Sequence, residues 1–184
     1  MILDRYRPQP GWFAHDPYGI HGIAHVARVL VWADFITQAV IDEGRDVDID
    51  IVRWAAVLHD VGRLDDDLDP GHGGRSAAWI EANRGLMGEG LDERQLQALQ
   101  EVCSRHMQAD ASIPVMTIEL ICLKDADGLD RVRLGDLNPM YLRTPHAREA
   151  IDRARKLMEW TSLRATRDPW ENTREISLAM GLWR

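Results

Sequence analysis

Apolar residues recur at helical spacing along most of this chain, and no stretch of useful length alternates apolar and polar residues as a half-buried strand would. Residues 21–41 carry an apolar stripe that ends before Gly44, a residue suited to a helix C-cap. The next segment, up to Gly62, repeats this pattern with Asp48 or Asp50 as its N-cap. The spacing therefore predicts an all-α protein, a compact helical bundle.

The same periodicity predicts four later helices, over residues 73–83, 91–107, 114–129 and 146–163. A short tail with Trp170 and Trp183 follows them. A chain of 184 residues can bury one core without disulfides, so we expect a single domain. We divide it into an irregular lead-in (1–19), a helical core (20–135) and C-terminal helices that pack on the core (136–184). The amphipathic pattern of residues 146–163 is consistent both with closing the core and with forming a homodimer face.

Charge and cysteine usage narrow the class of protein. The net charge of −8 argues against a nucleic-acid partner or an anionic membrane surface, because such surfaces require a positive field. Cys103 and Cys122 lie within apolar helical patterns, which is typical of core residues in a reducing cytosol. No run approaches ~18 to 20 uncharged apolar residues, and the N-terminus lacks an export signal, so we expect a cytoplasmic protein without a membrane span.

Ionisable residues occupy positions where apolar ones are expected. His59 and Asp60 end the apolar segment "AAVLHDVGR", and His25 shares the inward face of the first predicted helix. The same holds for His72, His106 and a carboxylate of "KDADGLD". One imidazole on an apolar face is usually a core residue that is hydrogen-bonded to a backbone carbonyl. Four histidines and two carboxylates from five segments, however, would share one or two divalent cations more readily than find six separate partners. Such ligands suit Mn, Fe, Co, Ni or Zn.

Five motifs together resemble the HD-domain superfamily of metal-dependent phosphohydrolases, over about residues 20–135. They are "YGIHGIAHVARVLVWA", "LHDVGR", "GHGGRSA", "SRH" and "KDADGLDRV". The resemblance implies a first metal bound by His25, His59, Asp60 and Asp127, and a second completed by His72 and His106, with Asp60 bridging the two. Asp127 is favoured as the last ligand because Ala126, Asp127 and Asp130 match the family's Ala-Asp-x-x-Asp setting, and Asp125 stays open as the alternative.

The resemblance also implies a reaction, in which metal-bound hydroxide attacks the phosphorus of a small phosphate ester or nucleotide, as in a phosphomonoesterase or phosphodiesterase. Arg63 matches the basic residue that follows the family's His-Asp pair, and Arg75 and Arg131 are further cations for the phosphoryl oxygens. For each arginine a surface salt bridge is the competing interpretation. Asp60 would bridge the metals or orient the water, and Asp125 or Asp130 would act as a base or an orienting group.

Three other hypotheses compete with hydrolysis. Some relatives with this six-ligand arrangement are di-iron oxygenases. Other members of the superfamily are non-catalytic modules that sense a nucleotide or mediate assembly, but these often lose ligands, and this chain keeps the full set. The third hypothesis treats the six residues as hydrogen-bonded core groups without any metal. The three remaining histidines are not predicted to be metal ligands. We expect His21 to lie at a helix start close to the ligands, and His15 and His146 to lie on the surface.

Overall fold

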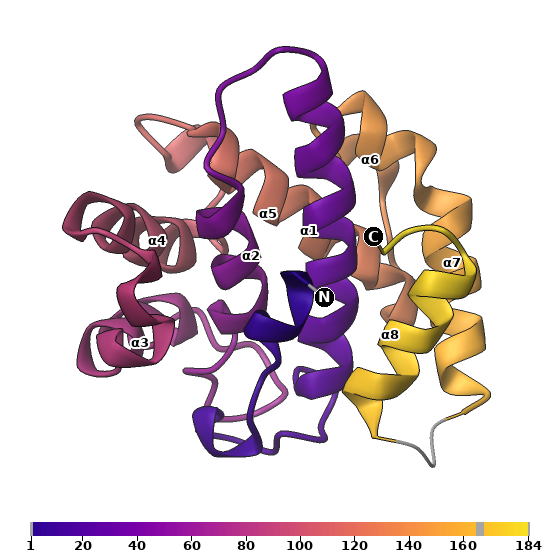
Figure 1. Cartoon of the computed structure of the whole chain (residues 1–184), viewed down its shortest axis with the longest axis horizontal. Helices are drawn as coiled ribbons and strands as arrows, with labels where there is room; N and C mark the ends of the chain where they lie inside the picture. The colour runs from indigo at the N-terminus through magenta and orange to yellow at the C-terminus, as the bar shows by residue number, and fades with distance from the viewer. Residues whose placement is uncertain (1, 165–167, 184) are drawn as a thin grey trace.

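The computed structural model describes residues 2–164 and 168–183, which contain eight α-helices and no strand (Figure 1). The helices are α1 (Ile23–Asp42), α2 (Ile49–Leu58), α3 (His72–Ala82), α4 (Glu93–Arg105), α5 (Ile118–Asp130), α6 (Pro145–Glu149), α7 (Ile151–Ser162) and α8 (Pro169–Ala179). Residues 1, 165–167 and 184, which belong to the predicted lead-in and C-terminal region, lie outside the described part. The all-α prediction is confirmed.

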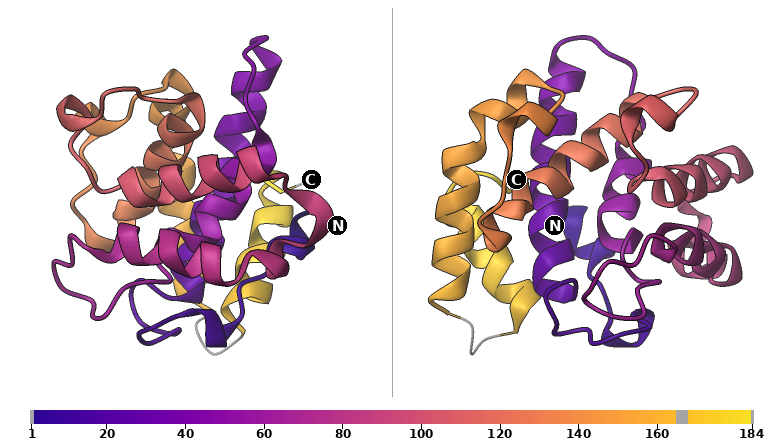
Figure 2. Two further views of the ribbon diagram at one scale, coloured as in Figure 1. Left: turned by 90° about the vertical axis from the view of Figure 1, so that its left-hand side faces the viewer. Right: turned by 180° about the vertical axis from the view of Figure 1, so that it is seen from behind.

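Helix α1 forms the centre of the bundle. It packs against α2 and α5, and α8 covers another of its sides. Figures 1 and 2 show α3 and α4 stacked beside α2, with α6, α7 and α8 on the far side of α1. By length and composition α1 could cross a membrane, but 72% of that window is buried inside the protein. Its apolar surface is therefore used by the core, where Trp32 and Ile36 are fully buried.

The ends of the central helices follow from local hydrogen bonds. Of the two predicted caps, Asp48 is the one that accepts hydrogen bonds at the start of α2. Helix α2 ends at Leu58, earlier than the predicted end at Gly62. Ser76 of α3 explains the early end, because its Oγ donates to the His59 carbonyl at 2.7 Å and accepts from the Gly62 amide at 3.0 Å. This contact holds the turn that carries the His-Asp pair.

The C-terminal region differs from the expectation in two ways. The single helix predicted over 146–163 is interrupted at Ala150, which is buried and separates α6 from α7. The predicted tail contains helix α8, whose N-cap Asp168 accepts a hydrogen bond from the Glu171 amide. Trp170 packs edge to face on Trp183, with ring centroids 5.3 Å apart, and so fixes α8 to the end of the chain.

Candidate metal centre

Five helices bring the six predicted ligands to one place in the interior. His25 lies in the first turn of α1, His59 and Asp60 directly follow α2, and Asp127 lies near the end of α5. His72 begins α3, and His106 follows α4. All of these side chains are buried except that of Asp127, which is 29% exposed. Asp127 therefore marks the side from which solvent reaches the cluster.

Asp60 lies between two groups of imidazoles. Its Oδ2 is 3.5 Å from His25 Nε2 and 3.7 Å from His59 Nε2. Its Oδ1 is 2.9 Å from His72 Nε2 and 3.7 Å from His106 Nε2. Asp127 Oδ1 joins the first group, at 3.5 Å from His25 Nε2. One carboxylate thus faces two neighbouring sets of ligand atoms.

The second ring nitrogen of each imidazole is hydrogen-bonded away from the cluster. The Nδ1 atoms of His59, His72 and His106 lie 3.0, 2.5 and 2.6 Å from the carbonyl oxygens of Ala56, Asp69 and Cys103. A carbonyl oxygen only accepts, so each Nδ1 carries the proton and each Nε2 presents a lone pair to the interior.

Facing lone pairs make this arrangement unfavourable unless a cation lies between them. His25 Nε2 is 3.3 Å from His59 Nε2, and His72 Nε2 is 2.9 Å from His106 Nε2. Two neutral imidazoles cannot hydrogen-bond through two acceptor nitrogens. A divalent cation satisfies such nitrogens and the intervening carboxylate together, and hydrogen-bonded Nδ1–H groups are usual behind metal-binding histidines. These residues therefore fit a metal centre.

The pKa shifts of His59 and Asp60 favour the forms that bind metals. Burial lowers the pKa of His59 to about 3, and its neighbour His106 acts in the same direction. Burial by itself would raise the pKa of Asp60, but that pKa lies well below its usual value, and the hydrogen bond with His21 acts in this direction. At neutral pH the centre therefore combines a neutral imidazole at His59 with an ionised carboxylate at Asp60.

Asp130 lies behind His25 rather than in front of the cluster. His25 Nδ1 is 2.8 Å from Asp130 Oδ2, and the same carboxylate accepts two hydrogen bonds from Arg28. Asp130 is fully buried, so it orients His25 and is not placed to act as a base toward a bound substrate. We did not predict Arg28 as a functional residue, although its position three residues after His25 on the inward face of α1 is a usable signal.

The alternative ligand Asp125 is contradicted by the structure. Its carboxylate accepts hydrogen bonds from the backbone amides of Arg143 and Thr144 at 2.8 and 2.7 Å, and from the Thr144 hydroxyl at 2.8 Å. Two residues along a helix correspond to a rotation of about 200°. Asp125 and Asp127 therefore occupy opposite faces of α5, and only Asp127 faces the cluster.

The three arginines predicted to bind substrate all have partners within the protein. Arg63 is buried beside the cluster, where its Nη1 is 3.9 Å from Asp60 Oδ1 and 3.1 Å from His72 Nδ1, while its Nε and Nη2 donate to the carbonyls of Asp65 and Asp67. Arg75 donates to the Gly62 carbonyl and to Asp69 in the same region. Arg131 is exposed and pairs with Asp136. Nearby acceptors therefore already bind the guanidinium groups of Arg75 and Arg131.

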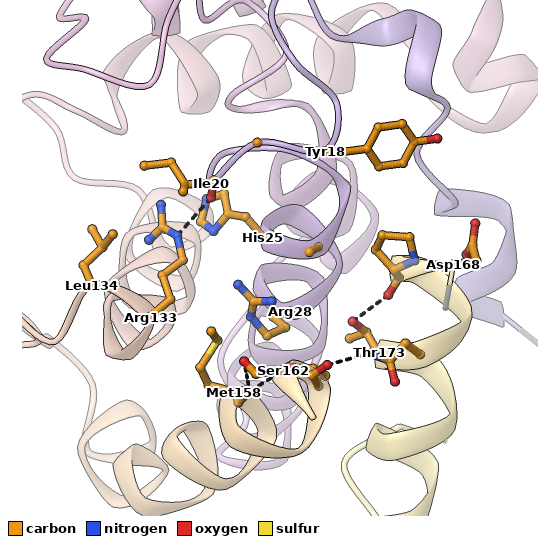
Figure 3. Close-up of a pocket in the computed structure, with 15 residues that line it drawn as sticks. Tyr18, Ile20, His25, Arg28, Arg133, Leu134, Met158, Ser162, Asp168 and Thr173 are labelled. Carbon is orange, nitrogen blue, oxygen red and sulfur yellow. Dashed lines mark hydrogen bonds between the residues drawn. The ribbon is translucent and has the colours of Figure 1, made fainter. Parts of the chain in front are cut away.

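A different arginine, Arg133, lies next to the cluster. Its Nη2 is 3.1 Å from His21 Nδ1, and that nitrogen is 2.8 Å from Asp60 Oδ2. Arg133 and His25 also line a cavity of about 560 Å³, whose opposite wall is formed by α7 and α8 (Figure 3). The sequence offers no signal for this cavity, because its walls come from segments far apart in the chain.

Comparison with known proteins gives one match. A family model for the HD domain matches residues 22–132. No curated protein and no solved structure matches the chain. The matched segment contains all six predicted ligands and ends before α6, so the C-terminal helices lie outside it.

Proposed function

This chain belongs to the HD domain family, and from that premise we propose that it is a metal-dependent phosphohydrolase that acts on a small phosphate ester or nucleotide. The observation that carries the proposal is the position of Asp60, whose two oxygens face two separate pairs of imidazoles. A carboxylate placed in this way suits a bridge between two divalent cations. The net charge of −8 supports a small substrate rather than a long polyanion.

The ligands divide into two sets that share one carboxylate. His25, His59, Asp60 and Asp127 would hold one divalent transition metal, and His72, His106 and Asp60 the other. A bound divalent cation supplies a water nucleophile at neutral pH and neutralises charge on the phosphoryl oxygens. Asp130 keeps the proton of His25 on Nδ1, so that Nε2 stays available as a ligand.

Access to the cluster supports a terminal phosphoryl group as the reacting group. The partly exposed residues next to Asp60 are Asp127 and His21, with side chains 29% and 18% exposed. The other ligand side chains are buried beneath helices. A phosphate at the end of a small molecule can approach such a centre more easily than an internal diester of a polymer, and so we favour a phosphomonoesterase.

Metal analysis and turnover of matched variants test this proposal. We expect the purified wild-type protein to bind up to two ions of Mn, Fe, Co, Ni or Zn per chain, measured by inorganic mass spectrometry. Asp60→Asn keeps the shape of the side chain, removes the charge, and should lower both metal content and phosphate release, the latter by about a thousandfold. His146→Ala is the control, because His146 lies on the surface and pairs with Glu43.

Each alternative has its own result in the same experiments. Full metal content and full turnover in both Asp60→Asn and His59→Ala would overturn the proposal. Oxygen uptake by the iron-loaded protein without phosphate release would assign the di-iron oxygenase. Tight nucleotide binding without turnover across all five metals would assign the sensing module instead.

A further inference from the structure

The cavity beside His25 is built largely by the C-terminal helices. Its volume is about 560 Å³, within the range of small-molecule sites. Residues from α7 and α8 form one wall, and residues 18–20, the start of α1 and the turn after α5 form the other. Among the described residues, His25 is the one predicted ligand that lines it. The cavity therefore adjoins the metal centre at a single predicted ligand, His25, which Figure 3 labels.

The wall of the cavity next to the metal centre carries more positive than negative charge. Arg28 and Arg133 both line the cavity, and both guanidinium side chains are only 6% exposed. Asp130 is the buried carboxylate that faces them, and it is already bound through both oxygens to Arg28. Asp168 at the rim is half exposed, caps α8 and pairs with Arg7. Arg133 Nε also lies 3.8 Å from Asp130 Oδ2, so two buried guanidinium groups share one carboxylate, and this wall keeps one positive charge in excess.

Arg133 is also short of hydrogen-bond acceptors. Its Nε donates to the Ile20 carbonyl at 3.1 Å, while its buried Nη1 has no partner among the described residues. Its Nη2 approaches His21 Nδ1, but a single nitrogen cannot donate to Asp60 and accept from Arg133 at once. The contact of His21 Nδ1 with the Asp60 carboxylate is shorter than its contact with Arg133 and is charge-assisted, so we assign the hydrogen bond to Asp60. This leaves Arg133 Nη2 without an acceptor at His21.

A second unpartnered polar group lies on the wall formed by α8. Asn172 is 4% exposed, and its Nδ2 donates to the Thr161 carbonyl. Its Oδ1 has no partner among the residues that the structure describes. Buried groups of this kind are rare in native proteins, and this one belongs to a residue that lines the cavity. The residues that line the cavity therefore include an unpaired donor at Arg133 and an unpaired acceptor at Asn172, both on atoms with almost no exposed surface.

We propose that Arg133 binds the phosphoryl group of the substrate and that the cavity holds its organic part. The inference rests on the proposed phosphohydrolase function, because the link through His21 to Asp60 places Arg133 between the cavity and the metal centre. The substrate class is a phosphate monoester with an organic group of about nucleoside size. That group carries a hydrogen-bond donor for Asn172 and an apolar face for Ile20 and Met158.

Binding to the metal-free, full-length protein tests the proposal without turnover. Calorimetric titration with 5′-AMP and with inorganic phosphate should show that AMP binds at least about tenfold more tightly, since only AMP occupies the cavity. Arg133→Gln should weaken both ligands by about tenfold or more, and Arg133→Lys should recover part of the loss. Arg131→Gln is the matched control, because Arg131 lies two residues away and pairs with Asp136 on the surface.

A second variant narrows the cavity without touching a buried contact. Ser162→Trp changes an exposed position of the wall. It should lower the affinity for AMP to that for inorganic phosphate and leave the affinity for phosphate unchanged. Leu163→Trp is its control, since Leu163 is 78% exposed and does not line this cavity. In the metal-loaded protein, Ser162→Trp should raise KM for AMP and change kcat little. Circular dichroism checks that each variant is folded.

Failure of this inference is distinguishable from failure of the proposed function. If metal-loaded protein hydrolyses AMP while Arg133→Gln and Ser162→Trp keep wild-type affinity and KM, the inference is overturned and the function stands. If metal-free protein binds AMP with the expected variant pattern but no phosphate is released with any metal, the function fails and the cavity assignment stands. Absence of AMP binding in the wild-type protein would also overturn the inference.

Discussion

The carboxylate of Asp130 binds the guanidinium of Arg28 through both of its oxygens, at 2.6 and 2.9 Å. Both residues are buried, and the same carboxylate lies 2.8 Å from His25 Nδ1. Burial by itself would raise the pKa of Asp130, but Arg28 and His25 hold it well below its usual value. The ion pair therefore keeps a buried carboxylate ionised where it can orient a predicted metal ligand.

Removing the charge of Asp130 is expected to affect stability and metal affinity separately. Asp130→Asn leaves Arg28 uncompensated, and we expect urea unfolding to show a loss of about 3 kcal/mol. Metal affinity should fall by about 10- to 100-fold, because the amide orients His25 less well. The double variant Arg28→Met with Asp130→Leu should regain stability without regaining metal affinity. Wild-type metal affinity in Asp130→Asn would show that this orienting role is absent.

Asp125 and Asp127 are expected to respond in opposite ways to substitution. Asp125→Ala leaves one buried and one partly buried backbone amide unpaired, and we expect a loss of about 2–4 kcal/mol in the free energy of unfolding, with metal content per folded chain unchanged. Asp127→Asn should lose metal and keep most of its stability, because its side chain is partly exposed. Urea titrations combined with metal analysis separate the two, and metal loss in Asp125→Ala alone would reverse the assignment.

Two adjacent glycines of α3 provide a matched pair for the packing of α3 against α4. A Cβ at Gly73 would lie 2.7 Å from the Cys103 carbonyl oxygen, whereas a Cβ at Gly74 would meet nothing within 4 Å. We expect Gly74→Ala to raise the unfolding free energy by about 0.5–1 kcal/mol through helix propensity. Gly73→Ala should lower it by about 1–3 kcal/mol, because α3 must move away from α4.

The substitution Gly73→Ala should also weaken metal binding. Gly73 follows His72, and the close approach at Gly73 brings His72 near His106. Metal titration should therefore show weaker binding of the second ion in Gly73→Ala and unchanged binding in Gly74→Ala. Equal stability and equal metal content in both variants would refute the close-packing argument.

Asp110 is expected to contribute stability that depends on pH. Hydrogen bonds from Arg143, and to a lesser degree from Lys124, lower the pKa of Asp110 to about 2, although burial opposes this shift. A lowered folded-state pKa stabilises the native protein above the unfolded value near 3.8, and this contribution is lost as pH falls through about 2.

Urea unfolding of Asp110→Asn at several pH values tests this contribution. Because the Asp110 side chain is 47% exposed, we expect a loss of only about 0.5–1 kcal/mol at neutral pH. The difference from the wild type should narrow as the solution is acidified below about pH 4. Asp152→Asn, at a position 85% exposed, should show no such dependence. A constant difference across the whole range would contradict the linkage.

Helix positions and candidate ligands were accessible from the sequence because both depend on local pattern. Apolar spacing predicts α1 to α5 to within a few residues, and one of the two predicted caps, Asp48, is the N-cap of α2. The helix that the tail contains was missed, although Asp168 followed by Pro169 is a start signal. The sequence could not decide between Asp125 and Asp127 as the last ligand. The two residues lie on different faces of α5, and only the structure shows which of these faces is turned toward the cluster.

The roles of the arginines were decided by tertiary structure alone. Arg63, Arg75 and Arg131 follow motif residues, and the sequence shows that cations are available near the centre. Which guanidinium group remains unsatisfied depends on acceptors contributed by distant segments, such as the Ile20 carbonyl beside Arg133. The sequence by itself determined a helical chain with imidazoles and carboxylates on inward faces, since periodicity is a local property. Only the folded structure decided how they pair, because a hydrogen bond requires contact in space between residues that the chain keeps far apart.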